Sequence, residues 1–196
     1  MQLIFESYAA EAAIPVGQFL RNRKLAKYFN RETAAALIAA RKLLDAHPCA
    51  ADTPFYYETG IMEFESLGLD AIADGSRDAT GHFDQRRFVE IGAKAVPPLT
   101  QFKALYNMPL SFIAIEHGLV GDNAVIYASA HGLLLQALNA PGDGDILLGC
   151  GKVQADASVD SAFALVSRAE LAAAAERHWP GEAIELFRAW RDREAA

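Results

Sequence analysis

Strand-like and helix-like segments alternate along this chain, and the alternation constrains the fold more than any other feature of the sequence. The strand-like segments are short and apolar, whereas the helix-like segments repeat apolar residues at helical spacing. The predicted strands cover residues 2–7, 55–60, 124–129, 145–149 and 162–166, and the predicted helices cover residues 24–46, 63–73, 99–117, 132–138, 169–177 and 182–193.

This order of segments, βαβαβαββ with helices behind it, predicts an α/β fold. Strands that alternate with helices favour a mostly parallel sheet with right-handed crossovers. The short connection before the last strand implies that this one strand runs antiparallel. Between residues 76 and 94 the sequence is polar and irregular, with Gly81 and Gly92 as breakers. We expect a structured functional loop there rather than a plain linker.

Length and composition indicate one folded domain over residues 1–196. The chain is 52% hydrophobic and 22% charged, which is typical of globular proteins. No apolar run approaches the roughly 20 residues that span a bilayer. Residues 1–6 lack the basic flank and small-residue cleavage site of a signal peptide. We therefore expect a cytoplasmic protein without a membrane span.

Charge and cysteine spacing exclude several classes of function. A formal net charge of −7 argues against a nucleic-acid partner, because phosphate binding depends on clustered Lys and Arg. The two cysteines, Cys49 and Cys150, have no metal-ligand spacing, which argues against a zinc site. The glycines do not follow the spacing of a phosphate-binding loop. We expect no metal and no cofactor beyond a possible pantetheine-linked acyl group.

The segment from Gly132 to Leu138 has leucines at consecutive positions, whereas a surface helix shows a single apolar stripe. A single sheet covers one side of such a helix. Either another part of this chain or a second subunit should cover the rest. The segment is therefore the strongest indication of dimerisation in the sequence.

The block from Asn107 to Gly121 carries the most specific pattern in the chain. It reads NMPLSFIAIEHGLVG and resembles, without a gap, the stretch of β-ketoacyl synthases that begins Asn-Met and ends Gly-Leu-x-Gly-Pro. Residues 125–151 then follow the family's order of a strand, a nucleophile elbow, a buried helix and a strand ending in paired glycines. The resemblance implies one half of a thiolase fold, whose second half would supply two catalytic histidines.

This chain departs from the family it resembles at the nucleophile. Counted from Ile126, the family's cysteine falls on Ala130, whose methyl group cannot carry an acyl chain. A gap of one residue would place Ser129 there instead. Asp122 replaces the family's proline, and the chain has the length of one half of the fold. We therefore expect no condensing activity from this chain by itself.

Ser129 and His131 flank Ala130 and form a candidate catalytic pair. A histidine at a helix N-terminus favours its neutral form and can exchange a proton, and a neighbouring serine could act as an oxygen nucleophile. The structural alternatives are equally simple. Ser129 could cap the following helix, and His131 could be a packed or capping residue.

Met108, Leu110 and Phe112 are candidate substrate-binding residues. In the condensing enzymes that this chain resembles, the region lies near the dimer interface and the acyl tunnel, so the three side chains could gate chain length. Ordinary core packing at helical spacing explains them as well.

Three functions remain open at this point. The first is a non-catalytic ketosynthase-like subunit that binds or measures an acyl chain in fatty-acid-like or polyketide-like synthesis. Its partners would be a condensing enzyme, as a heterodimer, and an acyl carrier protein. The second is an acyl transferase or thioesterase that uses Ser129 with His131. The third is a structural homodimer without a ligand.

Overall fold

The computed structural model describes residues 1–60 and 68–194 and groups them into two compact units. The larger unit holds residues 1–60 and 106–194, and the smaller unit holds residues 68–105. The polar segment at residues 76–94 falls in the smaller unit. The single domain expected from chain length stays a prediction, and each unit is described separately below.

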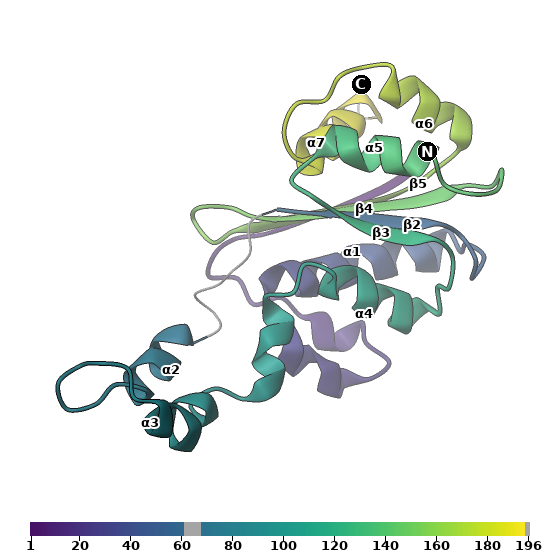
Figure 1. The fold of residues 1–196 in the computed structure, drawn as a ribbon. Helices are drawn as coiled ribbons and strands as arrows, with labels where there is room; N and C mark the ends of the chain where they lie inside the picture. Colours follow the sequence, from purple (N-terminus) through teal and green to yellow (C-terminus); the bar gives the residue numbers. More distant parts are fainter. Residues whose placement is uncertain (61–67, 195–196) are drawn as a thin grey trace. The chain divides into compact units, whose positions relative to one another are not determined.

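A five-stranded mixed sheet forms the centre of the larger unit (Figure 1), with the strand order β1-β5-β4-β2-β3. Strand β2 pairs in parallel with both β3 and β4, whereas β5 pairs antiparallel with β4 and β1. The predicted α/β class is therefore confirmed, and β5 runs against the other strands. The strands are β1 (Gln2–Tyr8), β2 (Phe55–Thr59), β3 (Asn123–Tyr127), β4 (Ile146–Val153) and β5 (Val159–Val166).

Helices cover both faces of this sheet (Figure 1). Helices α1 (Arg31–Ala46) and α4 (Met108–His117) lie on one face, where α1 packs on β5, β1 and β4. Helices α5 (Ala130–Leu138), α6 (Arg168–Ala175) and α7 (Ala183–Glu194) lie on the other face. Gly118 ends α4 with a positive φ of 72°, as its place after the apolar segment predicted.

The first long helix starts later than its apolar spacing predicted. Residues Arg23–Tyr28 form a separate 3₁₀ segment, and α1 begins only after Asn30. The Asn30 side chain accepts a hydrogen bond from the Thr33 amide at 2.8 Å, which makes Asn30 the N-cap of α1. The cap satisfies one of the first amides of α1, which have no backbone acceptor within a helix that begins at Arg31.

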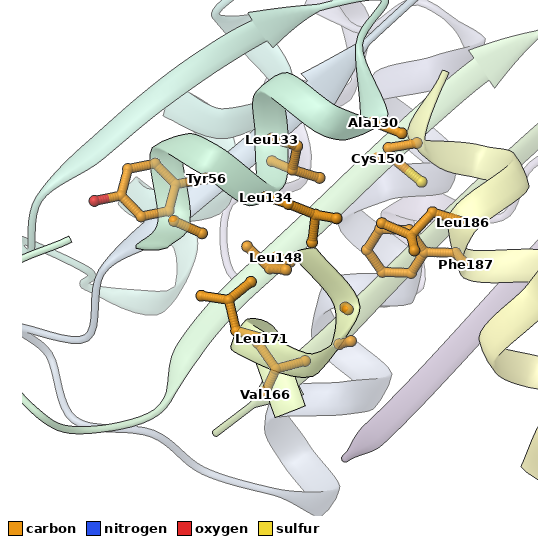
Figure 2. Packing of buried hydrophobic residues seen from close by; sticks show 14 of the residues in the cluster. Tyr56, Ala130, Leu133, Leu134, Leu148, Cys150, Val166, Leu171, Leu186 and Phe187 are labelled. Carbon is orange, nitrogen blue, oxygen red and sulfur yellow. The ribbon is translucent and has the colours of Figure 1, made fainter. Parts of the chain in front are cut away.

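The main apolar cluster fills the space between the sheet and helices α5, α6 and α7 (Figure 2). Leu133 and Leu134 of α5 are fully buried there, and Leu171 of α6 and Phe187 of α7 contribute to the same cluster. The chain therefore covers most of its leucine-rich helix with its own C-terminal helices. Leu135 and Leu138, by contrast, remain exposed.

The smaller unit consists of short helices joined by turns. They are α2 (Leu69–Gly75), α3 (Gln85–Glu90) and 3₁₀ segments at Gly92–Lys94 and Pro98–Lys103. The segment at residues 76–94 is thus partly helical, because the Asp84 carboxylate accepts a hydrogen bond from the Arg87 amide at 2.8 Å and caps α3. The predicted helix at 63–73 is described from residue 69 onward, and its first part lies outside the described residues.

Gly149 allows an aromatic ring to lie flat on the centre of the sheet. A Cβ atom at Gly149 would overlap the ring of Phe163, which is buried and stacks on Tyr57 with ring centroids 5.9 Å apart. Only a residue without a side chain leaves room for this ring.

Replacing Gly149 with alanine should therefore lower the free energy of unfolding by about 1–3 kcal/mol, because the new methyl group displaces Phe163. Gly144→Ala is the matched control, since nothing lies within 4 Å of a Cβ there, and it should change stability by less than about 0.5 kcal/mol. Urea unfolding of both variants measures the difference. Equal effects would contradict the packing described here.

Candidate functional site

The turn between β3 and α5 is the place where the sequence predicts a nucleophile. Ala128 has a positive φ of 48°, which is unusual for a residue with a side chain, and Ser129 and Ala130 follow at the start of α5. A sharp strand-to-helix turn with a strained residue is the geometry that exposes a nucleophile in many acyl-transfer enzymes. Here the strained residue carries only a methyl group.

Ser129 caps helix α5. Its hydroxyl oxygen accepts a hydrogen bond from the Gly132 amide at 3.0 Å. The amide of Ala130, the residue after Ser129, donates a hydrogen bond to the carbonyl of Gly181 at 2.8 Å. The segment before α7 thus occupies a backbone N–H that an oxyanion site at this helix start would need.

His131 lies beside another histidine rather than beside Ser129. Its ring centroid is 5.3 Å from that of His178, and its buried Nδ1 atom has no hydrogen-bond partner within residues 1–60 and 68–194. Within those described residues, Ser129 and His131 form no hydrogen bond with each other. The two predicted residues are close in the chain, yet they do not form a dyad in this conformation.

Neither cysteine thiol is activated as a nucleophile. Cys150 is fully buried in β4, and burial raises the pKa of its thiol well above the usual value. Cys49 is half-buried in the connection before β2, and burial raises its pKa as well. Both changes favour the unreactive thiol over the thiolate.

The three candidate substrate-binding residues belong to α4. Leu110 and Phe112 are buried, and the Phe112 ring meets the Phe29 ring edge-on, with centroids 4.7 Å apart. Met108 is half-buried at the first turn of the helix. The helix packs on α1, so core packing accounts for Leu110 and Phe112.

Glu58 is a functional candidate that the sequence analysis missed. It lies on β2 in register with Ile126 of β3 and Cys150 of β4, and its side chain is 1% exposed. Neither carboxylate oxygen has a hydrogen-bond partner of good geometry among the described residues, although the Ala183 amide lies close enough to favour the ionised form. It sits at the carboxyl end of the parallel strands, the edge at which open α/β sheets bind ligands. The one signal in the sequence is an acidic residue inside an otherwise aromatic strand.

Burial is the main reason that the pKa of Glu58 is raised to about 8, and the nearby carboxylates of Glu182 and Glu32 contribute to the rise. The Ala183 amide and the Lys152 ammonium act in the opposite direction without cancelling it. Lys152 itself pairs with Glu182, with 2.5 Å between Nζ and Oε2. At neutral pH Glu58 is therefore a buried neutral acid that can donate a hydrogen bond or a proton.

A second polar group lies on the opposite face of β2. The Glu32 carboxylate, in the first turn of α1, accepts hydrogen bonds from the hydroxyls of Tyr57 at 2.9 Å and Thr59 at 2.8 Å. All three side chains are buried. Burial and contact with Glu32 raise the pKa of Tyr57 well above its usual value, so Tyr57 remains a donor. Glu32 is thus fully engaged in joining a helix to the sheet.

Asp122 also has a structural explanation. Its carboxylate accepts a hydrogen bond from the Tyr56 hydroxyl, and its carbonyl accepts one from the Phe55 amide at 2.8 Å. Asp122, which stands where the Gly-Pro pattern has proline, therefore connects the start of β3 to the start of β2 through two hydrogen bonds.

Comparison with models of known protein families gives no match, and comparison with curated proteins gives no relative of this chain. Across residues 1–60 and 68–194, no three or more His, Cys, Asp or Glu side chains are arranged to hold a metal ion. None of the helices described in those ranges has the length and apolarity needed to cross a bilayer.

Glu58→Gln should remove a pH dependence from folding stability. An ordinary glutamate loses its proton near pH 4.3 in the unfolded chain, whereas Glu58 keeps its proton up to about pH 8 when folded. The folded state thus binds more protons between these pH values, and stability falls as pH rises, by at most about 1.4 kcal/mol per pH unit. The variant should unfold with a flatter pH profile and be more stable than wild type at pH 8.

Glu176→Gln, at an exposed position after α6, is the control and should leave the pH profile unchanged. Urea titrations at pH 5, 6.5 and 8 measure the three proteins. Wild-type and Glu58→Gln profiles that run parallel from pH 5 to pH 8 would show that Glu58 is ionised when folded.

Proposed function

We propose that this protein is a non-catalytic, β-ketoacyl-synthase-like subunit that assists acyl-chain condensation carried out by a partner enzyme. The observation that carries the proposal is the turn from β3 into α5, where Ala128, Ser129 and Ala130 present two methyl groups and a serine engaged as a helix cap. The thiolase-like half implied by the Asn107–Gly121 block belongs to this proposal. The α/β class and mixed sheet are compatible with it.

The first amide of α5 is already hydrogen-bonded, which supports a subunit that performs no acylation chemistry. The Ala130 amide is bound by the Gly181 carbonyl, and the residue before α7, Glu182, lies 3.2 Å from the position that a Cβ of Gly60 would take. Residues beside α7 thus approach the carboxyl end of β2 as well as the turn. An acyl thioester would have to displace them before it could reach the turn.

The exposed leucines of α5 support a partner subunit. Leu135 and Leu138 remain accessible after α6 and α7 have covered the rest of the helix. A condensing enzyme or a second copy of this chain would bury them. Met108 is the most accessible of the three α4 residues and would therefore contact an acyl chain whose length the subunit measures. An acyl carrier protein would deliver that chain.

A serine-dependent acyl transferase or thioesterase is the second candidate, because Ser129 is a hydroxyl at a helix N-terminus beside a histidine. Its oxygen accepts a hydrogen bond from the Gly132 amide, however, and the His131 ring lies tilted against the ring of His178. This geometry favours the capping role, since an active dyad needs a hydrogen bond from the hydroxyl to the imidazole.

Intact-mass spectrometry after incubation with acyl thioesters should show no covalent adduct on this protein under conditions that load an active condensing enzyme. The physical reason is the absence, at the described turn, of an accessible thiol or activated hydroxyl. An acyl adduct mapped to Ser129 would overturn the proposal in favour of the second candidate. Failure to recover a condensing enzyme or an acyl carrier protein with the tagged chain from its host would also count against it.

Ser129→Ala separates the two roles of the serine. Loss of the cap should lower the free energy of unfolding by about 1 kcal/mol, and neither wild type nor the variant should turn over a thioester. Ser167→Ala is the matched control, since Ser167 caps α6 away from the turn and should show a similar loss. Thioester hydrolysis by wild type that disappears only in Ser129→Ala would instead identify a nucleophile.

A further inference from the structure

A small hollow lies in the larger unit beside helices α6 and α7, at one end of β5. Its volume is about 270 Å³. This is just below the roughly 300 Å³ at which pockets for drug-sized ligands begin, so the hollow suits a smaller molecule. The residues that line it are Met1, Val166, Glu170, Ala173, Ala174, Trp190 and Arg193.

The walls of the hollow are apolar and held in place by the core. Val166 ends β5 and is 1% exposed, and Ala174 of α6 is also buried. The Trp190 ring of α7 packs edge-on against Phe187, with ring centroids 5.1 Å apart. A ring fixed in this way offers a preformed apolar surface, which lowers the entropic cost of binding a ligand.

The negative charge at the hollow is already neutralised. The Glu170 carboxylate binds the ammonium group of Met1, and it accepts hydrogen bonds from the amide of Ser167 at 2.9 Å and the hydroxyl of Ser167 at 2.8 Å. These contacts hold the pKa of Glu170 below its usual value. Glu170 is therefore committed to capping α6.

The positive charge at the hollow is not neutralised. Arg193 lies on the last turn of α7 and forms no ion pair within the described ranges of the chain. Its neighbour Arg191, by contrast, pairs with Asp192 and lies over the Phe5 ring. The hollow thus combines an apolar interior with one unpaired guanidinium, whose planar fork of donors matches a carboxylate.

We propose that this hollow binds a small amphipathic carboxylate, a free acid with an aliphatic or aromatic body of about ten heavy atoms. The body packs against Met1, Ala173 and the accessible part of Trp190, and the carboxylate pairs with Arg193. The guanidinium would repel a cationic ligand, and a neutral ligand would lack the negative charge that attracts the guanidinium. The proposal is independent of the ketosynthase-like function, because no residue of the turn before α5 lines the hollow.

Calorimetric titration with octanoate, octanamide and octylamine tests the proposal on the intact chain. The three probes share one apolar tail and differ in charge. Octanoate should bind with a dissociation constant of about 1 mM or lower, octanamide about tenfold more weakly, and octylamine without measurable heat. No octanoate binding, or equal affinity for all three probes, would overturn the proposal.

Two variants locate the site. Arg193→Gln should weaken octanoate binding about tenfold and octanamide binding by less than about threefold, because only the carboxylate adds a charge–charge attraction to the hydrogen bond. Ala173→Phe should abolish binding of both, since its ring fills the hollow from an exposed position on α6. Arg177→Gln, which removes an arginine over the Trp179 ring outside the hollow, is the matched control and should bind as wild type.

Octanoate that binds Arg193→Gln and Ala173→Phe as tightly as wild type would refute the site. Arg193 is exposed, so its variant keeps the fold and remains informative even where the phenyl ring introduced by Ala173→Phe perturbs α6. The titration uses neither a thioester nor a protein partner. Its outcome is therefore separate from the acylation and recovery experiments.

Discussion

The hydrogen bonds from Tyr57 and Thr59 to the buried Glu32 carboxylate join the start of α1 to the carboxyl end of β2, and the arrangement around them depends on this contact. A carboxylate inside a protein is stable only when its oxygens are satisfied. Gly151 of β4 must lack a side chain here, because a Cβ would lie 2.6 Å from Glu32 Cγ. The contact thereby fixes which face of β2 meets α1.

Because side chains alternate along a strand, this choice turns Glu58 toward α5 and α7. On that face the Gly181 carbonyl binds the Ala130 amide at the start of α5, and Glu58 has no hydrogen-bond partner of good geometry among the described residues. The same strand end thus holds two acids on opposite faces: Glu32, which accepts two hydroxyl hydrogen bonds, and Glu58, whose ionised form is favoured only by the Ala183 amide and Lys152. A neutral Glu58 makes this arrangement tolerable at physiological pH, since protonation removes the charge that burial disfavours.

The order of strands and helices could be predicted from the sequence because the apolar runs are buried on both faces, as β2 and β4 show. Helix starts were harder to place. Asn30 and Asp84 begin α1 and α3 through side-chain hydrogen bonds that leave no trace in the apolar spacing. The cap at Ser129 was one of two roles that the sequence left open, and it could be foreseen because a serine directly before a helix is a local signal. Glu58 was missed because its importance depends on which residues pack on it, and these come from distant parts of the chain.

On the proposed function, Ser129 acts only as a helix cap, and the turn before α5 performs no nucleophilic chemistry. A fluorophosphonate reacts with serines that a neighbouring base has activated and spares those that only cap a helix. The most direct measurement is the intact mass of the protein after prolonged exposure to such a reagent at pH 8. A capping serine leaves the mass unchanged, whereas a single phosphonyl adduct on Ser129 would identify it as an activated nucleophile.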